Sequence, residues 1–513
     1  MNRLEPSAPT PLRMWLVAAT FVLGTAGLLL ATGGNLGVAL APAALVAVLY
    51  GVARAPVGVT ACALLAAGLL FDNPYEQPGM GLFRTPLYAP GSLLYNTFEK
   101  TLRLPGAKVY AIEALCLGLA ALVLLRARKP RDDEEPGPAS PLAAAVRVAF
   151  LALLFWEVYG LARGGSMRFS LLQVRTVLFA FTLPLVFAWC FRARGYVTAV
   201  VAIVLSVACV RSLFAVYYWA TVIRHDIRGS ADPGGGAYVL THSDTVLLVT
   251  ALVTVLAWLV MRPSRRSALL AAVVVPVVGL GVIVNNRRLA IVSLVISLGL
   301  IYLVSSRAIR RRLNLVGAAL VPFVLAYIAV AWSSTAPWAA PVQALKSVIL
   351  PGDASAETRD IENYNLVVTL RQGPLLGQGF GHEYIEQVRA YDISHAFEAY
   401  RYVPHNSVLW LYSAMGVVGF TLMWMLLAVG AFLAVRTFHL AQRDDERLIS
   451  LVTVAVIAIY GLQAYGDMGL GSWMGALLFS AHLGLVGAAA TRVGAWPSRA
   501  PQGPGATSST VTE

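Results

Sequence analysis

Long runs of apolar residues repeat along most of the chain and restrict what it can fold into. Hydrophobic residues fill 58% of the 513 positions, and charged residues fill only 13%. A helix of about 20 apolar residues crosses the roughly 30 Å of hydrocarbon in a bilayer, and the runs in this sequence have about that length. We therefore predict an all-α fold, a polytopic membrane protein.

The apolar runs predict about fourteen transmembrane helices. Their approximate limits are 14–32, 36–53, 56–71, 107–125, 142–162, 173–191, 196–222, 241–261, 267–284, 289–305, 313–332, 405–434, 448–465 and 473–490. We divide the chain into an N-terminal transmembrane bundle of about seven spans (1–240), a core (241–434) with one long polar loop (333–404), C-terminal transmembrane helices (435–490) and a tail (491–513). The tail is rich in Pro, Gly, Ser and Thr, so we expect it to be disordered.

Connections rich in Lys and Arg alternate along the chain with connections that are not. This alternation determines how a membrane protein is oriented in the bilayer. The short basic connections are 54, 126–131, 192–194, 262–266, 307–312 and 436–447. Because short cytoplasmic connections collect Lys and Arg, we expect these on the cytoplasmic side, together with both termini. The long segments 72–106, 223–240 and 333–404 then lie outside. The same pattern explains the net charge of +13, so we expect the lipid bilayer, and no nucleic acid, as a partner.

The sequence contains no pattern typical of a metal site or a nucleotide site. Four cysteines lie in apolar runs without the spacing of metal ligands, at positions 62, 116, 190 and 209. Neither the phosphate-binding GK[ST] motif nor the zinc-binding HExxH motif occurs. We therefore expect no metal and no cofactor.

A basic hairpin breaks the alternation of charge. Residues 285–288 read Asn-Asn-Arg-Arg and connect two predicted spans on the outer side, where basic residues are disfavoured. The two arginines either snorkel to lipid phosphates or form an anion site at the outer membrane surface. A guanidinium matches phosphate oxygens and stays charged, so Arg287 and Arg288 are candidate phosphate-binding residues. Which of the two has this role stays open.

Arg211 is a charged residue inside the seventh predicted span. A charged side chain within a span usually faces the interior of the bundle or a cavity, because contact with lipid is costly. Two interpretations stay open. Arg211 either forms an ion pair that stabilises the bundle or supports a ligand site.

The long polar loop between the eleventh and twelfth predicted spans carries Arg359, a predicted helix over 357–370 and a glycine-rich run over 373–381. Glycine-rich loops cradle phosphates in dinucleotide-binding folds, but the strand before and the helix after such a loop are missing here. The alternative is that Gly379 and Gly381 allow the backbone to approach neighbouring helices closely.

His405 lies at the end of this loop, between Pro404 and Asn406, where a spanning run begins. This places the imidazole at the outer membrane surface, near the N-terminal end of a helix. The helix dipole there disfavours imidazolium, which keeps a histidine neutral and able to accept a proton. A bound diphosphate would have the opposite effect. A structural role and a role as general base both stay open at this point.

Together these pieces resemble the O-antigen ligase/polymerase family of bacterial cell-envelope glycosyltransferases. The matching pieces follow the order of the family: the hairpin 286–288, Thr358-Arg359, the glycine run 373–381, His405-Asn-Ser-Val-Leu409 and Gly416-Val-Val-Gly419. The serine that the family has in the hairpin is replaced. The resemblance covers residues 240–430 approximately and makes the core 241–434 O-antigen ligase-like.

The resemblance implies a membrane enzyme of the bacterial inner membrane with a periplasmic active site. Its donor would be a glycan on undecaprenyl diphosphate, transferred with inversion and without a metal to an acceptor hydroxyl. Arg287 or Arg288, together with Arg359, would bind the donor diphosphate, and His405 would be the general base. Possible supporting residues are Asn406, Arg211, Gly379 and Gly381.

Three activities within the family share these motifs. A polymerase joins repeat units of O-antigen or exopolysaccharide, a ligase moves the glycan onto the lipid A core of lipopolysaccharide, and a protein O-oligosaccharyltransferase moves it onto a protein. The large number of predicted spans favours the polymerase, whose partners would include a glycan acceptor and a chain-length regulator.

A lipid-linked glycan flippase or another transporter belongs to a different class of function that also fits the number of spans. Transporters place substrate sites near the midplane of the bilayer, in broken helices. This sequence instead concentrates its polar residues in outer segments, which favours an enzyme.

Overall fold

The computed structural model describes residues 22–24, 26–27, 30, 51, 54–74, 85–102, 106, 108–127, 137–222, 239–334, 336, 339–349, 354–389, 392, 394 and 397–496. The chain divides into two compact units, residues 1–60 and 61–513. In the first unit, the described residues are mainly helical, and most of each of the predicted spans 14–32 and 36–53 lies outside them. The features considered below belong to the second unit.

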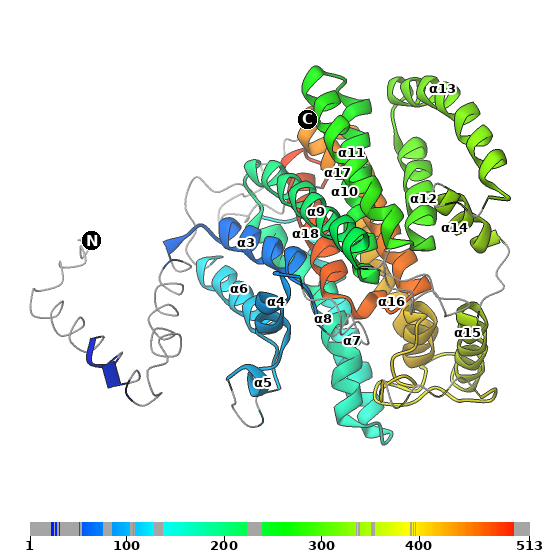
Figure 1. The fold of residues 1–513 in the computed structure, drawn as a ribbon. Helices are drawn as coiled ribbons and strands as arrows, with labels where there is room; N and C mark the ends of the chain where they lie inside the picture. Colours follow the sequence, from blue (N-terminus) through cyan, green and yellow to red (C-terminus); the bar gives the residue numbers. More distant parts are fainter. Residues whose placement is uncertain are drawn as a thin grey trace, which may run out of the picture. The chain divides into compact units, whose positions relative to one another are not determined.

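Every named element in the described part of the chain is a helix (Figure 1). The helices are α3 (Val57–Leu70), α4 (Tyr88–Tyr95), α5 (Phe98–Leu102), α6 (Ala111–Ala127), α7 (Ser140–Ala162), α8 (Met167–Cys190), α9 (Gly195–Thr221), α10 (His242–Met261), α11 (Arg265–Asn285), α12 (Arg288–Val304), α13 (Arg307–Ala331), α14 (Ala340–Ile349), α15 (Ala354–Gln372), α16 (Ser407–Leu440), α17 (Asp444–Gly466), the 3-10 helix η4 (Gly469–Gly471) and α18 (Trp473–Arg492).

Nine of the described helices are long and apolar enough to cross a membrane, which confirms an all-α polytopic membrane protein. They are α7, α8, α9, α10, α11, α13, α16, α17 and α18. The total of fourteen spans stays a prediction. Several helices begin earlier than predicted, most clearly α8 at Met167, α13 at Arg307 and α17 at Asp444. Their first turns carry charged residues, and a prediction from apolar runs does not detect the part of a helix that extends beyond the hydrocarbon.

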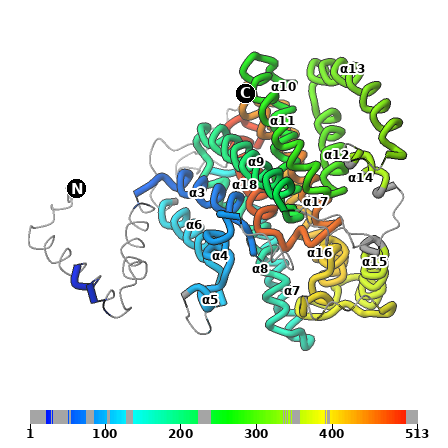
Figure 2. Tube along the Cα trace, viewed as in Figure 1, coloured from blue at the N-terminus to red at the C-terminus, as the bar shows by residue number. Residues whose placement is uncertain are grey.

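Helix α18 forms the centre of the bundle, because its whole spanning window is buried inside the protein. It packs against α8, α10, α16 and α17 (Figures 1 and 2). Small residues permit this close packing. A Cβ atom on Gly484 would lie 2.6 Å from Cβ of Phe187 on α8, so only glycine fits there without movement. By contrast, none of the window of α13 is buried, as expected of a helix that faces lipid.

One end of the bundle is held together by ion pairs between connections that carry basic residues. Glu446, at the start of α17, accepts from Arg492 Nε at 3.1 Å and lies 3.7 Å from Arg194 Nε. Arg262, after α10, lies 3.8 Å from Asp444. The short connections that the charge pattern assigned to one side of the membrane therefore meet at one end of the bundle.

The opposite end, where α10, α12, α16 and α18 begin, is called the site end below. Hydrogen bonds join its helices directly. Ser472 Oγ, at the start of α18, donates to Ser243 Oγ on α10 at 2.6 Å, and Ser407 Oγ on α16 donates to the carbonyl of Asp467 at 3.4 Å. The polar loop packs here too, because Ser166 N donates to Gly381 O at 2.8 Å.

Candidate active site

His405 lies at the site end, where α16 begins, and it is held by a residue of α15. Its Nδ1 lies 2.8 Å from Glu362 Oε2, and its backbone N–H donates to the same oxygen at 3.3 Å. The next residue, Asn406, caps α16 by accepting from Leu409 N at 3.0 Å and donates to Asn363 Oδ1 at 2.9 Å. Two consecutive residues before α16 therefore bind two consecutive residues of α15.

The contact with Glu362 determines which nitrogen of His405 can act as a base. Glu362 is almost completely buried, with 4% of its side chain exposed, whereas His405 is 27% exposed. An ionised carboxylate can only accept hydrogen bonds, so Nδ1 carries the proton and donates it. This leaves Nε2 of the neutral ring as the nitrogen that can accept a proton from an acceptor hydroxyl.

Helix α15 is itself fastened to the rest of the polar loop. The buried side chain of Asn365 accepts from the backbone of Gln387 and Val388, both at 3.0 Å, and donates to Val388 O at 2.7 Å. Thr369 Oγ1, one turn further, accepts from Ile385 N at 2.8 Å. Glu362 therefore projects from a helix whose position is fixed by side-chain contacts with the loop that follows it.

Tyr384, in that loop, borders the same carboxylate. Its phenol is buried, and burial together with the negative charge of Glu362 raises the pKa of Tyr384 above its ordinary value. Tyr384 therefore stays protonated and does not compete with His405 as a base.

A second histidine, His242, lies at the start of α10. Its Nδ1 pairs with the carboxylate of Asp467, which follows α17, and its Nε2 lies 2.9 Å from Arg287 Nη1. A guanidinium has donors only, so Nε2 must be the acceptor and Nδ1 must carry the proton. His242 therefore connects a buried carboxylate to one of the hairpin arginines.

His242 contacts Arg287 directly, and Arg359 and His405 lie within electrostatic range of its imidazole, so these four residues form one group. They come from four places: the starts of α10, α12 and α16, and the second turn of α15. Arg359 lies three residues before Glu362, so both point from the same face of α15. Arg288, the first residue of α12, directly follows Arg287 and is half-buried.

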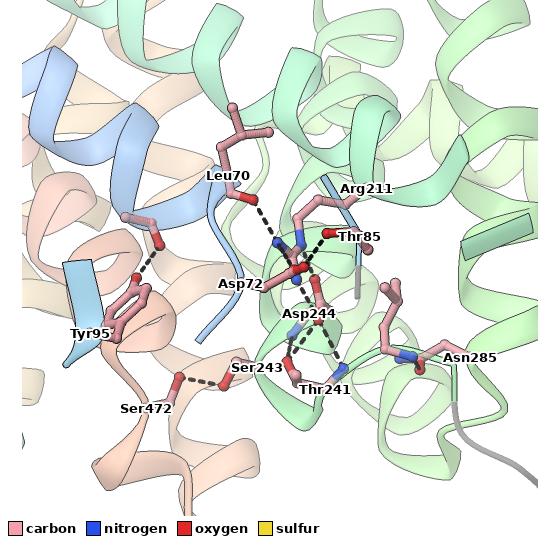
Figure 3. Close-up of polar contacts among 12 residues, drawn as sticks. Leu70, Asp72, Thr85, Tyr95, Arg211, Thr241, Ser243, Asp244, Asn285 and Ser472 are labelled. Atoms are coloured by element: carbon pink, nitrogen blue, oxygen red, sulfur yellow. Dashed lines mark hydrogen bonds and ion pairs between the residues drawn. The ribbon is translucent and has the colours of Figure 1, made fainter. Parts of the chain in front are cut away.

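Arg211 does not belong to this group of residues. It is fully buried on α9, where its guanidinium pairs with Asp244, lies 3.0 Å from Asp72 and donates to the carbonyl of Leu70 at 2.7 Å (Figure 3). Removing a buried guanidinium from between two carboxylates leaves their charges unpaired, which destabilises a bundle. The contacts favour the structural interpretation of Arg211, with a connection to the site through α10, the helix of Asp244.

The glycine-rich run 373–381 forms backbone hydrogen bonds with α16 where that helix is broken. Gly416 has φ 60° and ψ −175°, which interrupts the hydrogen bonds of that helix. Four backbone bonds join the run to the break: Val417 N to Pro374 O (2.9 Å), Val418 N to Leu375 O (3.2 Å), Gln378 N to Ser413 O (3.2 Å) and Gly379 N to Ala414 O (2.8 Å). The run therefore supplies the partners that the broken helix lacks.

Gly379 and Gly381 have positive φ angles of 84° and 85°. A Cβ on Gly379 would lie 2.2 Å from Cα of Gly160, and a Cβ on Gly381 would lie 2.9 Å from the backbone of Ser166. Their N–H groups donate to Ala414 O and to the side chain of Gln173, so they do not face an open phosphate-binding loop. The geometry favours close packing as the role of both glycines.

Residues 277–424 match the model of a family described as O-antigen ligase. This part of the chain is an O-antigen ligase-family domain, which supports the resemblance to the O-antigen ligase/polymerase family. No curated protein matches the chain. The matched residues include Arg287, Arg288, Arg359 and His405, and the family suggests a glycosyltransferase-like enzyme activity.

Three residues of the site were missed by reasoning from the sequence: Glu362, His242 and Asp467. Glu362 lies inside the O-antigen ligase-family domain, whereas the other two lie outside its limits. The sequence carried one signal for His242, since Thr241-x-x-Asp244 is a capping pattern and the structure contains that capping box. It predicts that a helix begins at His242 and so places this residue at the site end. No comparable signal marks Glu362 or Asp467.

Proposed function

We propose that the protein transfers a glycan from undecaprenyl diphosphate to an acceptor hydroxyl at the periplasmic face of the inner membrane, and that it polymerises polysaccharide repeat units. The O-antigen ligase-family domain supports this class of reaction. The observation that carries the mechanism is the pairing of His405 with the buried Glu362, in the same group of residues around His242 as Arg287 and Arg359. Transfer of a glycan from a diphosphate requires a base for the acceptor hydroxyl and cations for the leaving diphosphate.

The arginines would act on the leaving group. When the bond between the sugar C1 and the diphosphate oxygen breaks, negative charge develops on the diphosphate. Arg287 and Arg359, both near His242, would bind this group before the reaction and stabilise its charge during it. One well-placed donor of this kind typically contributes about 10²–10³ in rate. Arg287 is the hairpin arginine that the proposal assigns to this role, because it contacts His242.

His405 would act on the acceptor. The acceptor O–H gives its proton to Nε2, the acceptor oxygen forms a bond to C1, and the diphosphate leaves with the electron pair of the bond that breaks. A single displacement of this kind inverts the configuration at C1. Glu362 holds Nδ1–H and stabilises the imidazolium that forms, so it orients the base and does not take the proton.

The reaction is tested with the purified protein and a donor consisting of a glycan on undecaprenyl diphosphate. Release of undecaprenyl diphosphate and growth of the glycan are the results that the proposal expects. A protein that binds the donor and moves it across a vesicle membrane without cleaving it would be a transporter, and that result would overturn the proposal.

A deletion strain distinguishes the activities within the family. Loss of an O-antigen polymerase leaves lipopolysaccharide with a single repeat unit on its core. Loss of a ligase leaves bare core, which would contradict the polymerase proposal. Loss of an exopolysaccharide polymerase leaves the lipopolysaccharide unchanged and abolishes the secreted polymer, which is the second result that agrees with polymerisation.

A further inference from the structure

Asp467, His242 and Arg287 form a continuous chain of contacts at the site end. The carboxylate of Asp467 is buried, pairs with Nδ1 of His242 and accepts from the backbone of Met468 at 2.8 Å. Nε2 of His242 accepts from Arg287 Nη1 at 2.9 Å, and Arg287 Nη2 donates to Leu240 O at 3.4 Å. The three residues come from three different helix ends, so their alignment is a property of the fold.

This chain gives His242 a role that differs from the role of His405. A base needs an available lone pair, and the only lone pair of neutral His242 is directed at Arg287. The imidazole thus acts as a rigid spacer between a fixed carboxylate and a long, flexible guanidinium side chain. An arginine held in this way is ordered before its ligand arrives, and less freedom is lost on binding.

Several helices hold the start of α10 in place, so the position of His242 beside Arg287 is well defined. Ser243 accepts from Ser472 of α18, and Leu240 N donates to Asn285 Oδ1 of α11 at 2.9 Å (Figure 3). Asp244 completes the capping box of α10 and pairs with the buried Arg211 of α9. Contacts from α9, α11 and α18 therefore converge on the turn that carries His242.

The backbone at Arg287 is also held in a defined position. Asn286 ends α11 in the left-handed conformation, with φ 49° and ψ 37°, and Arg287 directly follows it. Asparagine tolerates this conformation better than most residues. The tight turn sets where the Arg287 side chain begins, and His242 sets where its guanidinium ends.

We propose that Asp467 and His242 are positioning residues that hold the Arg287 guanidinium in place for the donor diphosphate. The inference rests on the proposed function, because it assumes that Arg287 binds that group. It adds residues outside the family domain to the binding site, one before and one after it in the sequence.

The test measures binding of undecaprenyl diphosphate to the purified full chain, together with donor KM and kcat. His242→Leu should weaken binding by between about tenfold and about 10²-fold. A displacement of a functional group by about 1 Å has an effect of up to that order. His242→Gln keeps an acceptor for Arg287 and should recover most of the binding. Asp467→Asn can donate an amide hydrogen bond to Nδ1, which favours the tautomer of His242 with its N–H on Nε2, facing Arg287, so it should weaken binding like His242→Leu.

A double-variant comparison separates positioning from a general structural effect. In an Arg287→Ala background, His242→Leu should weaken binding by no more than about twofold, because it acts through the missing guanidinium. His439→Leu changes an exposed histidine at the far end of α16 and should bind like wild type.

Equal losses from His242→Leu with and without Arg287 would overturn the inference, as would wild-type binding by His242→Leu. In those cases Arg287→Ala still binds weakly, so the proposed function survives. If the wild-type chain does not bind undecaprenyl diphosphate, the proposed function fails, and the inference fails with it.

Discussion

Replacing Glu362 by Gln removes one negative charge beside His405 and keeps the size of the side chain. The buried carboxylate accepts the Nδ1–H of His405, and in the proposed mechanism its charge would stabilise the imidazolium that forms when His405 takes a proton. A glutamine still offers one oxygen as an acceptor but without the charge. It also brings an amide donor that can turn towards Nδ1 and favour the other tautomer. We therefore expect Glu362→Gln to lower kcat.

The contacts set the size of this loss. Glu362 Oε2 accepts from His405 Nδ1 at 2.8 Å and from His405 N at 3.3 Å, and the shorter bond is the one that supports the imidazolium. A hydrogen bond to a charged group contributes about 1.5–3 kcal/mol, and each ~1.4 kcal/mol corresponds to tenfold in rate. The expected decrease in kcat is therefore about 10- to 160-fold.

The assay follows release of undecaprenyl diphosphate by the purified variant at saturating donor. Donor KM should change little, because Glu362 has no part in binding the diphosphate. Glu357→Gln is the matched control, since Glu357 lies on the same helix and is exposed. A kcat for Glu362→Gln within about twofold of wild type, with the thermal unfolding midpoint preserved, would refute this account of the base.

Three further predictions concern the arginines and the glycine-rich run. Arg359→Lys keeps the charge and loses the guanidinium fork, so donor KM should rise by about tenfold or more; Arg371→Lys, exposed on the same helix, is the control, and equal donor KM values for the two variants would argue against diphosphate binding by Arg359. Arg211→Leu leaves two buried carboxylates without their cation, so the free energy of unfolding should fall by about 3–5 kcal/mol in a denaturation experiment; an unchanged value would show that the ion pair contributes no stability. Gly379→Ala places a Cβ 2.2 Å from Cα of Gly160 at a φ of 84°, which should cost about 2–6 kcal/mol of stability, and a wild-type midpoint of thermal unfolding would contradict the packing role.

The helices of the bundle could largely be predicted because a spanning helix is encoded by one local run of apolar residues. The helix expected over 357–370 is part of α15 for a similar reason, since its pattern is local. The early starts of α8 and α13 could not be predicted from hydropathy, because their first turns carry charged residues. The short helix α14 was also missed, within a segment that was treated as a loop.

The candidate site could be predicted only in part. Charge alternation assigned Arg287, Arg359 and His405 to one side of the membrane, and the structure brings the three close to His242. Glu362 was not recognised as a partner of His405, since their contact depends on how the polar loop folds back over the start of α16. Such pairings between distant segments leave no pattern in a single sequence.

The glycine-rich run shows the same limit of local patterns. Its sequence permits both a phosphate-binding loop and close packing, and the choice between them depends on where its N–H groups point. Gly379 N donates to Ala414 O, beside the break in α16 at Gly416. The position of the break requires glycine, because a Cβ on Gly416 would lie 2.2 Å from Leu375 O.

The central claim is that His405 takes the proton of the acceptor during transfer from undecaprenyl diphosphate. The most direct test is glycan transfer by His405→Ala, compared with His439→Ala, which changes an exposed histidine at the far end of the same helix. The account predicts a loss of about 10²–10⁴-fold in kcat for His405→Ala, with donor binding retained, and wild-type transfer for His439→Ala. Transfer by His405→Ala at a near wild-type rate would contradict it.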